Sequence, residues 1–354
     1  MGLIKVGIIG IGNCASSLVQ CVEFLKKNFK SVKNNFGILH PLIGKYKIEN
    51  IEFVAAFDVA ANKVGRDLSE GIFAFPNCAS KFYDVPNLGI DIYKGPILDG
   101  LSANLRKEIK VAPSVRNVDV ASKLIENDAE LLINFLPTGS IKASNYYAHQ
   151  ALEANCGFIN AIPELIASNP DWSKKVLDEN LPLVGDDVKS QIGGTIIHRA
   201  LIDLFNQRGV KIIETSQSNF GGNADYLNLS DKSRFKSKLH TKETAIRSLI
   251  PNEVFIDMPL PIYQQELGDS RICKIFIDGR YFGNTPISLD LNIKIEDSPD
   301  ASGVIVDLIR IMKLALERGE SGVLHEICPF YFKHPPIPCD DKTAYQKVKN
   351  FIEE

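Results

Sequence analysis

The chain has 354 residues, of which 45% are hydrophobic and 23% charged, and its formal net charge is −3. This is the composition of a folded globular protein with the length of two closely joined domains, so a disordered or fibrous chain is excluded. The slightly negative charge argues against nucleic acid or an anionic membrane surface as a partner.

Strands and helices alternate along the first half of the chain. Short apolar runs predict buried strands at 4–9, 51–57, 131–136, 157–162 and 183–185. Helical spacing of apolar residues predicts helices at 15–27, 59–68, 118–127 and 143–154. The polar stretch 28–50 is expected to be a long loop or lid. This alternation predicts an α/β fold with a Rossmann-type, doubly wound parallel sheet.

The pattern changes near residue 190. A helix is predicted at 193–208, strands at 210–219, 272–281 and 289–295, and helices at 301–318 and about 342–353. Alternating apolar and polar residues in 289–295 indicate a mixed sheet that is at least partly antiparallel. We therefore expect an inserted α+β domain of mixed sheet after the parallel one.

The cysteines and the apolar runs bear on the compartment. The chain has seven cysteines and no Cys-x-x-Cys pair, which favours reduced thiols in the cytoplasm over a disulfide framework. No apolar run approaches the roughly 18 residues of a membrane span. The stretch 325–328 holds His325 and Cys328 but has no second ligand cluster nearby, so no metal site is predicted.

A glycine motif follows the first strand. Gly10, Gly12, Asn13, Cys14 and Ala15 fit a G-x-G-x-x-A pattern between a strand and a helix. Such a turn lets the backbone approach a pyrophosphate at a helix N-terminus.

The next strand ends at Asp58, whose carboxylate could accept the ribose hydroxyls and would repel the 2′-phosphate of NADP. These residues predict NAD as the cofactor. A glycine turn that binds no nucleotide is the alternative.

Two polar stretches follow later strands. Residues 185–191 include Asp187, Ser190 and Gln191 at the carboxyl end of a buried strand, where open α/β sheets bind ligands. A solvated turn is the alternative. Residues 219–225 include Asn223 and Asp225 among glycines that allow a ligand to approach closely, or else form a simple hairpin or loop.

Basic residues gather in the second half. If residues 236–242 are helical, Lys238 and Lys242 lie one turn apart, and a phosphate between them would relieve their repulsion. A solvated basic face is the alternative. Further candidates are Asp269, Arg271, Asp297 and Lys333, although Asp297 or Ser298 could simply cap a helix and Lys333 could be a surface lysine.

Taken together, these motifs resemble one family. The segments that carry the resemblance are 10–17, 54–58, 184–190, 222–225, 235–242, 297–298 and 332–333. In this order they are similar to the myo-inositol-1-phosphate synthases, also called inositol-3-phosphate synthases, of the shorter bacterial and archaeal branch. The resemblance spans essentially the whole chain.

The resemblance implies an isomerase, an intramolecular lyase, that converts D-glucose 6-phosphate to 1D-myo-inositol 3-phosphate with tightly bound NAD⁺. It also implies a homotetramer. The implied division is a cofactor domain at 1–190, a catalytic and tetramerisation domain at 191–300, and C-terminal helices at 301–354 that return to the cofactor domain. Whether a divalent or monovalent cation takes part is left open.

The resemblance also implies roles for single residues. Those expected at the cofactor are Gly10, Gly12, Asn13, Cys14, Asp58, Pro137, Asn160, Asp187 and Asp297. Those expected around the substrate are Ser190, Gln191 and Asn223. Those expected in catalysis are Lys238, Lys242, Lys333, Asp225, Asp269 and Arg271. Arg271 stands where the family commonly has lysine, so it can bind phosphate but cannot transfer a proton near neutral pH.

The chemistry explains the need for cations. Oxidation at C5, enolisation, aldol ring closure and re-reduction develop negative charge on oxygens, which preorganised cations stabilise. We expect Lys238 at the C5 oxygen and in proton transfer, and Lys333 at the C1 oxygen or the phosphate. Lys242 and Arg271 are expected at the phosphate. Clustering should lower the lysine pKa values.

Two alternatives share the cofactor half. A sugar-phosphate dehydrogenase would release NADH in proportion to product. A non-catalytic NAD-binding relative would bind without turnover, and its charged groups would not converge in a cleft.

Overall fold

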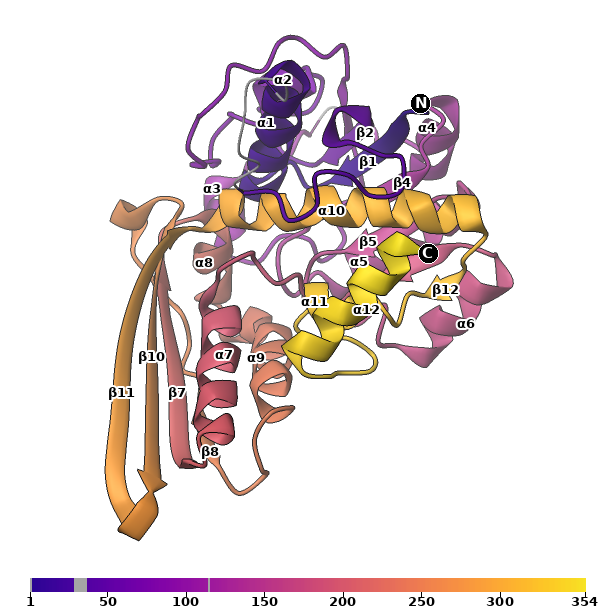
Figure 1. Ribbon diagram of the computed structural model, residues 1–354. Helices are drawn as coiled ribbons and strands as arrows, with labels where there is room; N and C mark the ends of the chain where they lie inside the picture. Colours follow the sequence, from indigo (N-terminus) through magenta and orange to yellow (C-terminus); the bar gives the residue numbers. More distant parts are fainter. Residues whose placement is uncertain (1, 29–36, 114) are drawn as a thin grey trace.

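The computed structural model describes residues 2–28, 37–113 and 115–354. Within these ranges, a seven-stranded sheet has the order β12-β6-β5-β4-β1-β2-β3 (Figure 1). Its strands are β1 (Ile4–Ile9), β2 (Ile51–Asp58), β3 (Ile92–Lys94), β4 (Leu131–Asn134), β5 (Gly157–Asn160), β6 (Pro182–Val184) and β12 (Gly322–Val323). Each neighbouring pair in this sheet is parallel, which confirms the predicted doubly wound sheet.

Helices connect these strands. They are α1 (Asn13–Asn28), α2 (Leu68–Gly71), α3 (Leu105–Glu108), α4 (Val120–Glu126), α5 (Ile141–Glu153) and α6 (Pro170–Asp178). The strand order reverses at β1, which pairs with β2 on one side and β4 on the other. A ligand crevice forms at the carboxyl ends of the strands where the order of an open sheet reverses.

The helix predicted at 59–68 is wrong. These residues form turns, and only Leu68–Gly71 is helical. The Asp58 carboxylate accepts hydrogen bonds from the amides of Val59 and Ala60 at 2.6 and 2.9 Å, and a side chain that binds its own following amides favours a turn over a helix. Asp67 caps the short helix instead, accepting from the Ser69 amide at 2.9 Å.

Helix α6 was not predicted. Asn169 caps it by accepting from the Asp171 amide at 2.9 Å, and Pro170 opens its first turn. Asparagine followed by proline is a helix-start signal, so the sequence carried this information.

The loop or lid expected at 28–50 lies only partly in the described residues. Residues 29–36 are outside them. Residues 37–47 are irregular, and a 3-10 helix follows at Ile48–Asn50. Arg310 donates to the carbonyl oxygen of His40 at 2.8 Å, which attaches this segment to the long helix α10.

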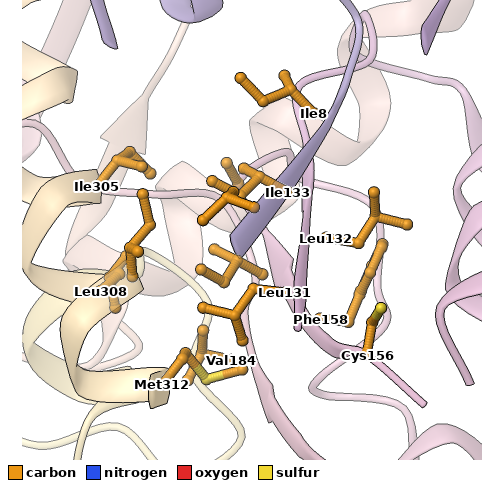
Figure 2. Packing of buried hydrophobic residues seen from close by; sticks show 14 of the residues in the cluster. Ile8, Leu131, Leu132, Ile133, Cys156, Phe158, Val184, Ile305, Leu308 and Met312 are labelled. Atoms are coloured by element: carbon orange, nitrogen blue, oxygen red, sulfur yellow. The ribbon is translucent and has the colours of Figure 1, made fainter. Parts of the chain in front are cut away.

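Helix α10 (Asp297–Arg318) crosses the molecule and packs on the parallel sheet (Figure 1). Its side chains Ile305, Leu308 and Met312 are buried and lie beside strand residues of β4 and β6 (Figure 2). Full burial of such a side chain stabilises the fold by about 1.5–3 kcal/mol. The helix begins four residues before the predicted start at 301, so Asp297 and Ser298 are helical.

The second sheet is mixed, as predicted. Its order is β11-β10-β7-β8, and β9 also pairs with β7. Strand β10 is antiparallel to β7 and β11, whereas β8 and β9 are parallel to β7. The strands are β7 (Lys211–Gly221), β8 (Phe255–Asp257), β9 (Ile262–Tyr263), β10 (Ser270–Tyr281) and β11 (Thr285–Glu296).

Three helices accompany this sheet: α7 (Gly194–Gln207), α8 (Ala224–Leu229) and α9 (Lys232–Arg247). Ile202 of α7 and Ile246 of α9 join a second apolar core with Ile275 and Ile277 of β10. The β10–β11 hairpin extends away from the parallel sheet (Figure 1).

The C-terminal segment adds β12 to the edge of the parallel sheet and then forms α11 (Cys328–Tyr331) and α12 (Asp341–Glu353). Arg199 of α7 donates to Asp341 at 2.8 Å, which joins α12 to α7. Among the described residues, no helix is long and apolar enough to cross a membrane.

Candidate active site

A cavity of about 1470 Å³, including its open mouth, lies where the carboxyl ends of the parallel strands meet α9, α10 and the start of β10. Residues predicted for the cofactor and for the substrate line the same cavity. They are Gly10, Gly12, Asn13, Cys14, Asp58, Pro137, Asp187, Ser190, Asn223, Asp225, Lys238, Arg271, Asp297 and Lys333. The charged groups therefore converge in a cleft, which argues against the non-catalytic alternative.

The glycine turn fits a dinucleotide. Gly10 has φ +82°, and a Cβ there would lie 2.7 Å from the carbonyl oxygen of Phe135. A Cβ on Gly12 would meet nothing within 4 Å, so space lies in front of the turn. Helix α1 begins at Asn13 with its free amides towards that space. A pyrophosphate is the kind of group that such a cradle accepts.

Asp58 is held rigidly at the end of β2. Besides Val59 and Ala60, the amide of Ile11 donates to its carboxylate at 2.9 Å. Lys63 lies 3.9 Å from the same carboxylate and donates to the Ile11 carbonyl oxygen at 2.6 Å. Burial lowers the pKa of Lys63, while Asp58 opposes this shift. The turn is thus braced from both sides.

Asp187 is the centre of a buried charged cluster in the cavity. It follows β6 with φ +61°, a left-handed conformation that is uncommon for residues other than glycine and often marks functional sites. Lys238 and Lys333 donate to the same carboxylate oxygen at 3.1 and 2.9 Å, and Thr241 donates to the other. Burial would raise the pKa of this carboxyl, but the two lysines and Thr241 hold it well below its usual range.

The two lysines that contact Asp187 have pKa values shifted in opposite directions. Burial lowers the pKa of Lys333 to about 8 despite Asp187, with the help of Lys238 and Arg271. For Lys238 the lowering effect of burial is outweighed by Asp187, Asp225 and Asp297, so its pKa is raised. The expectation that clustering lowers every lysine pKa is therefore wrong for Lys238, because three carboxylates surround it.

Lys242 lies behind the cavity wall. It is one turn along α9 from Lys238, is 6% exposed and is not among the residues that line the cavity. Burial and then Arg271, Lys238 and Lys333 lower its pKa to about 7. The predicted helix at 236–242 is confirmed, but its second lysine lies deeper than the first.

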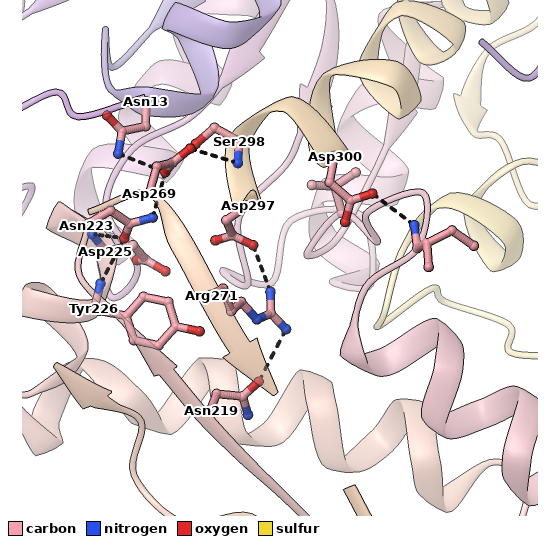
Figure 3. A network of polar contacts seen from close by, with 12 residues as sticks. Asn13, Asn219, Asn223, Asp225, Tyr226, Asp269, Arg271, Asp297, Ser298 and Asp300 are labelled. Atoms are coloured by element: carbon pink, nitrogen blue, oxygen red, sulfur yellow. Dashed lines mark hydrogen bonds and ion pairs between the residues drawn. The ribbon is translucent and has the colours of Figure 1, made fainter. Parts of the chain in front are cut away.

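Arg271 is engaged by the protein itself. Its guanidinium donates to Asp297 at 2.9 Å and to the side-chain oxygen of Asn219 at 3.3 Å (Figure 3). Burial would raise the pKa of Asp297, but Arg271 lowers it. A lining cation paired in this way presents a fixed, permanent charge to the cavity.

Asn223 and Asp225 start α8. The Asn223 side chain caps the helix by accepting from the amides of Asp225 and Tyr226 at 3.1 and 3.3 Å. The simple hairpin considered for 219–225 is therefore wrong. Asp225 accepts a hydrogen bond from Thr138 at 3.1 Å, which joins the loop after β4 to the start of α8.

Four predicted residues do not line the cavity. Asn160 is fully buried and donates to Asp186 at 2.7 Å, and Gln191 donates to the Gly37 carbonyl oxygen at 2.9 Å. Lys242 and Asp269 lie in the layer behind the wall. In the turn at 185–191, Asp187 and Ser190 line the cavity. Asp186 does not, because its carboxylate is bound by Asn160 and by backbone amides.

The helix-cap alternative for Asp297 or Ser298 is also wrong. Glu296 occupies the cap position, and the Ser298 hydroxyl donates to Asp269 at 2.9 Å.

Lys63 and Thr138 are among the lining residues that sequence reasoning missed. Thr138 follows β4, and polar residues at the carboxyl end of a parallel strand are a usable signal. Lys63 had no such signal, because the helix expected at 59–68 would have carried it elsewhere. Among the described residues, no group of three or more His, Cys, Asp or Glu side chains is placed to hold a metal ion.

Comparisons with known proteins identify the family. A family model described as myo-inositol-1-phosphate synthase matches residues 193–298. The chain is 40% identical over 359 residues to the inositol-3-phosphate synthase of Corynebacterium glutamicum, covering 99% of this chain and 98% of that protein. The same identity and coverage hold for the inositol-3-phosphate synthase of Mycolicibacterium smegmatis.

A solved structure is also similar. The crystal structure of a myo-inositol-1-phosphate synthase-related protein from Thermotoga maritima matches with a TM-score of 0.84 at 27% identity, covering 99% of this chain and 98% of that one. The resemblance inferred from the motifs is confirmed. The chain belongs to the inositol-3-phosphate synthase family.

Proposed function

We propose that this protein converts D-glucose 6-phosphate to 1D-myo-inositol 3-phosphate in the cytoplasm, as an isomerase of the intramolecular lyase type. The observation that carries the proposal is the pair of lysines, Lys238 and Lys333, on the single buried carboxylate of Asp187 within a dinucleotide-type cavity. A plain dehydrogenase needs one acid–base group at the oxidised carbon. Ring closure between two carbons of one sugar needs charge stabilisation at two oxygens.

NAD is the proposed cofactor. Gly10, Gly12 and Asn13 would hold its pyrophosphate, with Cys14 beside them, and Asp58 would bind the adenosine ribose. Pro137, Asp187 and Asp297 would lie on the nicotinamide side. When bound, NAD⁺ supplies an acceptor for the hydride at C5 and later returns it. Asn160 would act from behind the wall, since its amide is bound to Asp186.

The lysines would act on the sugar oxygens. Lys238, whose pKa is raised, would stay charged and stabilise negative charge on the C5 oxygen. Lys333, with a pKa near 8, is suited to give and take a proton at the C1 oxygen near neutral pH. Proton transfer, which the sequence had suggested for Lys238, is better matched to Lys333.

Further groups would orient the substrate. Arg271 would face the phosphate with its fixed charge, and Lys242 would add positive potential from behind the wall. Ser190, Asn223 and Asp225 would bind hydroxyl groups at the cavity surface, and Gln191 would support them from the neighbouring segment. No step in this scheme is assigned to a metal ion or a monovalent cation.

The test follows inositol phosphate and NADH in the same incubation. Incubation with glucose 6-phosphate and NAD⁺ should yield inositol phosphate with no net absorbance at the NADH band, because the hydride is returned in every turnover. Stoichiometric NADH would instead indicate a sugar-phosphate dehydrogenase. Binding of NAD with neither signal would indicate a non-catalytic relative.

We also propose that the chain divides into a cofactor domain at 1–190, a catalytic and tetramerisation domain at 191–300, and returning helices at 301–354. The contacts between the subunits of a homotetramer would lie in the 191–300 domain. The face of the mixed sheet that points away from its apolar core carries Ser216, Lys274, Phe276 and Asn292 around a shallow hollow. A sheet face without covering helices is suited to pack against another sheet.

Sedimentation should therefore give the mass of four 39.2 kDa chains. Phe276→Asp on that face should shift the mass to smaller species, whereas Phe282→Asp at the hairpin tip should leave it unchanged. A wild-type monomer would contradict the proposed assembly.

A further inference from the structure

Asp269 is a buried carboxylate that receives four hydrogen bonds but does not line the cavity. It is 3% exposed and precedes β10. One of its oxygens accepts from the Asn13 and Asn223 side-chain amides at 3.1 and 3.0 Å and from the Ser298 hydroxyl at 2.9 Å. The other accepts from the Ser298 backbone amide at 3.2 Å. Figure 3 shows the three donor residues converging on it.

The donors come from three separate parts of the fold. Asn13 is the first residue of α1 and belongs to the glycine turn. Asn223 caps α8, and Ser298 is the second residue of α10. All three line the cavity. One carboxylate behind the wall therefore connects the cofactor turn to the two helix starts that carry Asp225 and Asp297.

Such an arrangement is costly to maintain. A buried carboxylate loses its hydration, and no lysine, arginine or histidine of the described residues forms an ion pair with Asp269. Burial and the charge of Asp297 raise its pKa to about 6, against which the hydrogen bonds act. Packing alone would be served by a neutral side chain, so the charge has another use.

We propose that Asp269 is a positioning residue that couples the cofactor turn to the substrate wall, acting on NAD through Asn13 and on the sugar phosphate through Asn223 and Ser298. The identification of the two ligands as NAD and a sugar phosphate rests on the proposed function. Asp269 touches neither ligand in this scheme, unlike the catalytic role that the family resemblance implies for it.

Asp269→Asn removes the connection at nearly constant volume. An asparagine has one acceptor oxygen, so its NH₂ group must face either the Ser298 amide or the three side-chain donors. Whichever way it turns, the hydrogen bonds on one side are lost and those on the other side have a neutral acceptor, so we expect affinity for both ligands to fall about tenfold.

The affinities for NADH and for glucose 6-phosphate can both be measured without turnover. NADH binding is followed by its fluorescence in the absence of sugar. Glucose 6-phosphate binding is then titrated into the NADH-loaded protein, which cannot oxidise the sugar because the nicotinamide is already reduced. Asp278→Asn is the matched control, since Asp278 lies further along β10 in a partly exposed pair with Arg280 and should change neither affinity.

Adding Asp269→Asn to two other variants separates its effect on NADH binding from its effect on sugar binding. In the Asn13→Ala protein, adding Asp269→Asn should no longer weaken NADH binding but should still weaken sugar binding. In the Ser298→Ala protein, the effect on sugar binding should shrink and the effect on NADH should remain. A general loss of structure would weaken both ligands equally in every background.

The proposal fails if Asp269→Asn leaves both affinities within about twofold, or if its effect on NADH persists undiminished in the Asn13→Ala protein. Should Asp269→Asn not fold, Asn13→Ala alone decides. If Asp269 couples the two sites, Asn13→Ala must weaken glucose 6-phosphate binding to the NADH-loaded protein. An unchanged affinity for glucose 6-phosphate overturns the proposal. A protein that shows this coupling but makes no inositol phosphate would refute the proposed function only.

Discussion

Lys238→Ala should lower kcat by about 10²–10³-fold, the usual cost of removing one preorganised group that stabilises an oxyanion. Lys238 is the lining lysine whose pKa is raised, and its ammonium group lies 3.1 Å from Asp187. It therefore stays charged in the free protein and is available when negative charge develops on the sugar. The measurement is a steady-state assay of inositol phosphate formation at saturating NAD⁺.

The control is on the same helix. Lys236→Ala removes an exposed lysine two residues earlier on α9 and should leave kcat unchanged. If Lys238→Ala retained turnover close to wild type while Lys236→Ala did the same, the assignment of Lys238 to the reacting oxygen would be wrong.

Asp187→Asn should destabilise the fold by about 3–5 kcal/mol, because it leaves Lys238 and Lys333 as buried cations without their shared partner. Asp187 is 1% exposed, and both ammonium groups lie within 3.1 Å of one of its oxygens. Activity should fall as well, since the two lysines would lose their positions and their pKa values would drop. Denaturant unfolding at neutral pH measures the stability change.

An exposed ion pair provides the comparison. Asp128→Asn breaks the pair between Asp128 and Lys5, in which the aspartate side chain is 80% exposed, and such pairs contribute about 0.2–1 kcal/mol. Equal losses for the two variants would contradict the picture of Asp187 as the anchor of a buried cluster.

The stability difference should also depend on pH in a defined direction. The pKa of Asp187 is lowered on folding, so its carboxylate stabilises the native state above the usual carboxyl pKa of 3.8. That contribution is lost as the pH falls below 3.8 and through the folded value. The difference between wild type and Asp187→Asn should therefore shrink in acid, as the pH falls below 3.8.

Local pattern was sufficient for much of the fold. Strands β1, β2, β4 and β5 are mostly apolar, because both faces of a parallel sheet are buried. The glycine turn was also visible, since few residues other than glycine adopt φ +82° at Gly10. The helix at 59–68 failed because apolar spacing says nothing about a carboxylate, Asp58, that binds the following amides.

The site shows a different limit. Chain order places Asp187, Lys238 and Lys333 in three segments, and motif resemblance named all three as site residues. Which of them share one oxygen depends on how α9 and the segment after α11 pack against the end of β6. Lys238 and Lys242 look alike in sequence, yet only Lys238 lines the cavity.

The sequence by itself determined the fold class, the dinucleotide turn and the family, because these depend on local periodicity, on glycine conformation and on motifs that short segments carry. Only the tertiary structure decided which predicted residues line the cavity, which lysine keeps its charge and that Asp269 lies behind the wall. The reason is physical: burial and charge–charge interactions are set by neighbours distant in the chain, and no local pattern records them.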